Sequence, residues 1–143
     1  MPLNPYVWFP HFKFMLQTIS VQYPRKPNEV TKKKYYEFIN NIPVFLPMKP
    51  LGKTFTIMLN KYPVTPYLDS RMSFMKWCHY IISKINEILE LPEQDFYKSL
   101  EEYYKEYKPK EELEKIEKDK QRKYIEIGII VTIILGIYLK YNR

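Results

Sequence analysis

The chain has 143 residues, a formal net charge of +7 and one cysteine, Cys78. A single thiol excludes an internal disulfide, a CxxC redox pair and a cysteine-rich zinc site, and no other metal site is predicted. Because lysines are interleaved with glutamates along the chain instead of forming one basic stretch, we expect no nucleic-acid partner. The length suits one small domain with an appendage.

The first two helices are predicted from apolar residues at helical spacing. The first is expected at residues 10–22 and the second at residues 29–45, with Asn28 as its N-cap. The second helix should end at Leu46, because the residue before a proline is pushed out of the α region. The expected apolar stripe of the first helix consists of Trp8, Phe12, Met15, Leu16 and Ile19. The expected stripe of the second consists of Tyr35, Phe38, Ile42 and Phe45.

Two further helices and a shorter fifth are predicted next. A third is expected at residues 52–61, and a fourth begins after Asp69 or Ser70 as its cap. Pro92 separates the fourth helix from a fifth at residues 93–107. The apolar positions of the fourth helix are Phe74, Trp77, Cys78, Ile81, Ile82, Ile85, Ile88 and Leu89. Short connections between these helices predict an all-α four-helix bundle with a short fifth helix.

The last third of the chain changes character twice. Residues 98–123 are rich in Glu and Lys with favourable i,i+4 pairs, which predicts a charged helical spacer interrupted at Pro109. Residues 127–139 carry no charge, and the flanking tyrosines extend them to a length that can span a membrane. The alternative is a buried C-terminal helix of the bundle. The predicted domains are therefore a bundle at 1–97, a spacer at 98–123 and a transmembrane anchor at 124–141.

Several short motifs in the predicted bundle occur in a specific order along the chain. Trp8-Phe9-Pro10, Leu16-Gln17 and Tyr23-Pro24 come first, and Ile85-Asn86 and Leu89-Glu90-Leu91-Pro92 close the fourth helix. Over residues 8 to about 97 this order and spacing resemble the Erv/ALR family of FAD-linked sulfhydryl oxidases. The resemblance implies a helical bundle that holds FAD beside a Pro-Cys-x-x-Cys pair and often forms a homodimer. Some large DNA viruses carry members of this family, which suggests a viral source.

The positions that carry the family's chemistry are replaced, whereas the helix-building positions remain. Met48 and Leu51 stand at the two cysteine positions, and neither side chain can pass electrons to a flavin, so no catalytic residue is predicted. Among the flavin positions implied by the resemblance, Trp8 and Asn86 are kept. The others differ from the family and are Lys13, Gln17, Ile82, Ser83 and Leu91. Ile82 and Ser83 stand where the family pattern has His and Asn. The resemblance implies FAD as the cofactor, but these replacements argue against its binding.

The leading interpretation is a catalytically degenerate, sulfhydryl-oxidase-like protein that is tail-anchored in a membrane. It would have a structural or partner-binding role, as a homodimer or with another protein. The alternative is an FAD-linked thiol oxidase that takes its redox dithiol from a partner. A third interpretation is a membrane-surface adaptor that uses its basic spacer near anionic lipid. Basic residues are more numerous before the apolar run than after it, which predicts a bundle on the cytosolic side of a cellular or virion membrane.

Overall fold

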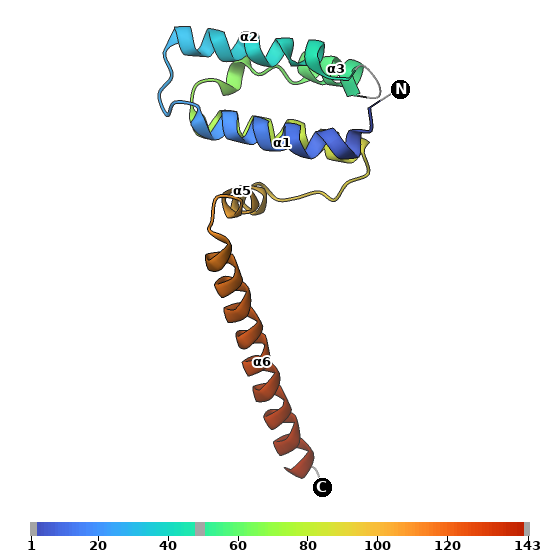
Figure 1. Ribbon diagram of the computed structural model, residues 1–143, viewed down its shortest axis with the longest axis vertical. Coiled ribbons are helices and arrows are strands. Elements are labelled where there is room, and N and C mark those ends of the chain that lie inside the picture. The colour runs from blue at the N-terminus through green and yellow to red at the C-terminus, as the bar shows by residue number, and fades with distance from the viewer. Residues whose placement is uncertain (1–2, 48–50, 142–143) are drawn as a thin grey trace. The chain divides into compact units, whose positions relative to one another are not determined.

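The computed structural model describes residues 3–47 and 51–141 and is all-helical there, as predicted (Figure 1). Its contacts divide the chain into two compact units, Met1–Leu100 and Glu101–Arg143. The helices are α1 (Pro5–Gln22), α2 (Glu29–Phe45), α3 (Lys53–Lys61), α4 (Arg71–Ile88), α5 (Phe96–Lys105) and α6 (Lys110–Tyr141), with a 3-10 turn, η2 (Thr65–Tyr67), before α4.

Local signals set several helix ends where the sequence predicts them. The Asn28 side chain accepts a hydrogen bond from the Thr31 N–H at 2.8 Å, and Ser70 Oγ accepts one from the Ser73 N–H at 3.2 Å. These bonds satisfy N–H groups that have no partner inside their own helix. Leu46 is extended and ends α2. Pro109 lies between α5 and α6, and the interruption predicted there is confirmed.

Two of the predicted helices have different ends in the structure. α1 begins at Pro5 and not at residue 10, because the Asn4 side chain caps it by accepting the Tyr6 N–H at 3.0 Å. Proline fits the first turn of a helix, where its missing N–H costs nothing. α5 is shorter than the predicted 93–107. The Asp95 carboxylate caps its start by accepting the Tyr97 N–H at 2.8 Å.

The core of the first unit lies where α4 packs along α1 and α3 packs against α2. The space between the helices is filled by apolar side chains that include Phe9, Phe12, Leu16, Ile39, Ile42, Phe55, Phe74, Ile81 and Ile85. The predicted stripe of α1 is wrong at Met15, which is 45% exposed. That of α2 is wrong at Phe38, which is 39% exposed, and at Phe45, which is 82% exposed. Ile88 of α4 is also exposed.

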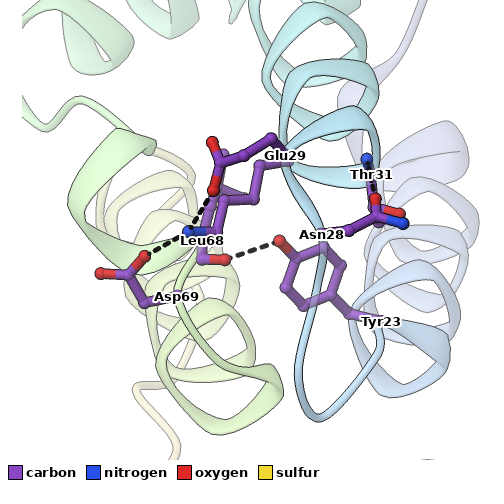
Figure 2. Close-up of polar contacts among 7 residues, drawn as sticks. Tyr23, Asn28, Glu29, Thr31, Leu68 and Asp69 are labelled. Carbon is purple, nitrogen blue, oxygen red and sulfur yellow. Dashed lines mark hydrogen bonds and ion pairs between the residues drawn. The ribbon is translucent and has the colours of Figure 1, made fainter.

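Polar contacts join the connection before α4 to α1 and α2, and Figure 2 shows the bond between Tyr23 and Leu68 among them. Tyr23 is fully buried, and its hydroxyl donates to the Leu68 carbonyl at 2.7 Å. The Lys32 ammonium lies 3.1 Å from a Glu29 oxygen and 2.8 Å from an Asp69 oxygen. Hydrogen bonds to Asp69 and Glu29 raise the pKa of Lys32. The buried hydroxyl bond and this ion-pair network hold the connection in place.

The part of the predicted spacer that follows Pro109 lies on one helix with the predicted anchor, α6, which has no break between residues 123 and 124. The Arg122 guanidinium pairs with the Glu126 carboxylate at 3.3 Å across that junction. An 18-residue window of α6 reaches a mean hydropathy of 1.7, and none of it is buried. By length and composition, α6 is able to cross a membrane.

Candidate functional site

The two positions at which the family has its cysteines, 48 and 51, come between α2 and α3 in the chain. Met48 lies outside the described residues. Leu51 is described, and its side chain is completely buried in the apolar core. A buried leucine contributes packing at this position and offers no group for disulfide exchange.

Cys78, the single thiol of the chain, lies on α4. It is 1% exposed, and burial raises the pKa of the thiol well above its ordinary value. It borders a small cavity of about 20 Å³ that is also lined by Gln17, Ser20 and Ser99. Since the thiolate is the reactive form of cysteine, a shielded and protonated Cys78 acts as a small apolar core residue.

We therefore expect Cys78 to react with N-ethylmaleimide at least about tenfold more slowly in the folded chain than in denaturant, because reaction must wait for local opening. Mass spectrometry of quenched time points measures both rates. The matched control is Cys78→Ser combined with Ser83→Cys, which moves the thiol to a partly exposed position on the same helix. That thiol should react rapidly in the folded state. Equal rates for Cys78 in folded and denatured chains would contradict its shielding.

Two of the flavin positions on α1, Lys13 and Gln17, make hydrogen bonds to residues near the end of the first unit. The Lys13 ammonium donates to Gln94 Oε1 at 2.9 Å, and Gln17 Nε2 donates to Ser99 Oγ at 3.1 Å. Lys13 and Gln17 therefore hold the first turn of α5 and the segment before it against α1.

The flavin positions on α4, together with Leu91 just after it, divide into buried and accessible ones. Ile82 is 2% exposed and belongs to the apolar core, and Asn86 is buried beside it on the same helix. The Asn86 carbonyl accepts the Leu91 N–H at 2.9 Å. Ser83 and Leu91 instead border an open groove of about 600 Å³, whose charged lining residues are Lys76, Lys84, Glu87 and Glu93.

Trp8 differs from the other flavin positions. Its indole N–H is buried and has no hydrogen-bond partner. Its ring lies edge-on to those of Phe9 and Phe12, with centroids 6.2 Å away in each case. Buried Trp N–H groups usually find an acceptor, so this atom is one that a bound group would satisfy.

A model of the Erv1/Alr family matches residues 14–122 of this chain. The chain belongs to the Erv1/Alr family. The resemblance predicted from the motifs is thereby confirmed, although the match begins after Trp8 and Lys13. It also runs into the charged spacer, beyond the residue near 97 where the motif resemblance stops.

Relatives of this Erv1/Alr chain include viral and yeast proteins. A probable FAD-linked sulfhydryl oxidase of Acanthamoeba polyphaga mimivirus is 31% identical over 85 residues, which are 59% of this chain and 59% of that protein. The chain thus spans less than two thirds of that curated relative. The crystal structure of the yeast Erv1 core has a TM-score of 0.64 and 19% identity, covering 72% of this chain and 86% of that one. The crystal structure of the FAD-binding domain of Erv1 from Saccharomyces cerevisiae has a TM-score of 0.64 and 19% identity. The match covers 71% of this chain and 94% of that one. These structures establish the fold.

FAD is the group that the family implies, and the residues at its predicted positions on α1 and α4 do not fit it. Lys13 and Gln17 are bonded to other parts of the chain, and Ile82 fills the core with an apolar side chain. At Trp8 the unpartnered indole N–H instead favours a bound group. Among residues 3–47 and 51–141, no cluster of His, Cys, Asp and Glu is arranged to hold a metal ion.

Proposed function

We propose that this Erv1/Alr chain is catalytically degenerate and serves as a membrane-anchored structural or partner-binding protein. One observation carries the proposal. The two redox positions hold Met48 and Leu51, and the single thiol, Cys78, is buried in the core. A sulfhydryl oxidase takes two electrons and two protons from a substrate dithiol through a disulfide of its own. One shielded thiol cannot form that disulfide.

The full chain, purified in detergent, is expected to show no thiol-dependent oxygen consumption with dithiothreitol or a reduced protein. The reason is the missing dithiol, and an oxygen electrode makes the measurement against a heat-denatured sample. A family member that retains its CxxC serves as the positive control. Oxygen uptake that depends on the thiol substrate would refute the proposal.

The second candidate function is an FAD-linked thiol oxidase that receives its dithiol from a partner protein. The unpartnered indole N–H of Trp8 favours it, since a bound cofactor would supply the missing acceptor. The same purified preparation distinguishes the two functions. A colourless protein that leaves added FAD free supports the degenerate form, whereas a yellow protein supports the oxidase.

We place α6 in the membrane with the bundle on the cytosolic side, in a cell or in a virion. The basic residues before the apolar run are Lys115, Lys118, Lys120, Arg122 and Lys123, and those after it are Lys140 and Arg143. By the positive-inside rule, the more basic flank stays in the cytosol. A glycosylation acceptor added after Arg143 should therefore be modified in microsomes, and one added at the N-terminus should not. The opposite pattern would reverse the orientation.

The partner in this proposal is a second copy of the chain or another protein. Its support is the apolar surface that α2 leaves exposed, which includes Phe38, Val44 and Phe45. Exposed apolar residues on one element are typical of interaction surfaces. Light scattering of the full chain in detergent, corrected for bound detergent, distinguishes a dimer from a monomer.

A further inference from the structure

Basic residues gather on α6 immediately before its apolar segment. Lys118, Lys120, Arg122 and Lys123 precede Tyr124, and all four are exposed. We call these four residues the basic belt. Asp119 is the one acidic residue within residues 118–123. Because α6 is unbroken here, helix geometry places the belt within about 9 Å along the axis, directly beside the apolar segment.

The four belt residues point to two sides of the helix and do not form a single stripe. Successive residues of a helix are rotated by about 100°, so Lys120 and Lys123 point to other sides than Lys118 and Arg122. A protein partner would contact one face of the helix, whereas lipid headgroups surround a membrane helix on all sides. Positive charge on two sides of the helix therefore fits surrounding headgroups better than one face of a protein partner.

The position of the belt along α6 also suits the headgroup layer of a membrane that the apolar segment would span. Tyr124, which follows it, is of the type that favours the membrane interface. Lysine and arginine side chains are long enough to lay their apolar stems along the helix and place their charges in the headgroup region. The Glu126 carboxylate, one turn deeper, is paired with Arg122 at 3.3 Å, which offsets its repulsion of anionic lipid.

We propose that the basic belt binds the headgroups of anionic phospholipids in the leaflet that faces the bundle. This inference rests on the proposed membrane anchoring by α6. Positive charges at an anionic surface are attracted over about one Debye length, so the belt acts on the lipids in its immediate surroundings. After the apolar segment come Lys140 and Arg143, two basic residues against the four of the belt.

The test uses the full chain reconstituted into phosphatidylcholine vesicles that contain a minority of phosphatidylserine. Electron spin resonance of spin-labelled lipids measures the relative affinity of the helix for phosphatidylserine over phosphatidylcholine. We expect a preference of roughly three- to tenfold that falls with added salt. The belt variant, Lys118→Gln, Lys120→Gln, Arg122→Gln and Lys123→Gln, should lose it. The control variant should keep the lipid preference. It replaces four exposed lysines of the bundle with Gln, namely Lys33, Lys34, Lys53 and Lys76.

Each other outcome overturns a defined statement. A belt variant that keeps the preference, or a control variant that loses it equally, refutes the belt as the lipid site. Carbonate extraction of the same vesicles separates this result from the anchor itself. A chain that resists carbonate but shows no lipid preference leaves the anchor standing and refutes the belt. A chain that carbonate removes refutes the anchor and the belt together.

Discussion

Replacing Ile82 with histidine, the residue type that the Erv/ALR pattern has at this position, should lower the free energy of unfolding by about 3–5 kcal/mol. Ile82 is 2% exposed in the apolar core of the first unit. The variant loses the packing of a buried aliphatic side chain and places imidazole nitrogens where they must find partners. Denaturant unfolding of the full chain in detergent, followed by circular dichroism, measures the change.

Ser83→Asn is the matched control for this prediction, because asparagine is the family's residue at the adjacent position. Ser83 borders the open groove, so the larger polar side chain reaches water, and the change should stay within about 0.5 kcal/mol. If Ile82→His costs no more than Ser83→Asn, the core around Ile82 is not closely packed. If added FAD restores the stability of the Ile82→His chain, the site accepts a flavin, and our proposal of a degenerate protein loses its support.

Two lysines in the middle of the apolar segment should remove the chain from the membrane. Val131→Lys and Ile134→Lys lie about one turn apart on α6, where each charge costs about 2.5–3.5 kcal/mol of insertion free energy. The sum corresponds to a loss of insertion greater than about a thousandfold. Carbonate extraction of membranes from expressing cells, followed by sedimentation, measures the retained fraction.

The control for the anchor places the same charges outside the apolar segment. Glu117→Lys and Gln121→Lys lie on the exposed, charged part of the same helix and should leave the chain in the carbonate-resistant fraction. If the double variant Val131→Lys, Ile134→Lys also stays resistant to carbonate, α6 is not the anchor.

The amino-acid sequence determined the features that depend on neighbouring residues. Caps and prolines act within one helical turn, and so Asn28, Ser70, Leu46 and Pro109 mark helix ends that the structure confirms. The loss of the two redox cysteines is evident from the sequence for the same reason, because each replacement is a matter of one residue's identity. The all-helical class and the family were also recoverable, since both rest on the order and spacing of apolar residues and motifs.

Tertiary structure alone decided which face of each helix is buried. Phe9 is buried and Met15 exposed on α1, and Ile39 is buried and Phe38 exposed on α2. In both helices, apolar residues stand next to one another in the sequence and therefore lie on neighbouring faces of the helix. Helical spacing alone allows either face to be the buried one, and the helices packed against it decide which.

The state of the flavin positions was likewise decided by contacts between distant segments. Lys13 and Gln17 meet Gln94 and Ser99, which lie 81 and 82 residues further along the chain. No local pattern specifies such a bond, because it exists only once α5 is placed against α1. The buried, unpaired N–H of Trp8 has the same origin: whether a polar atom is enclosed and whether an acceptor lies within reach depend on the assembled core.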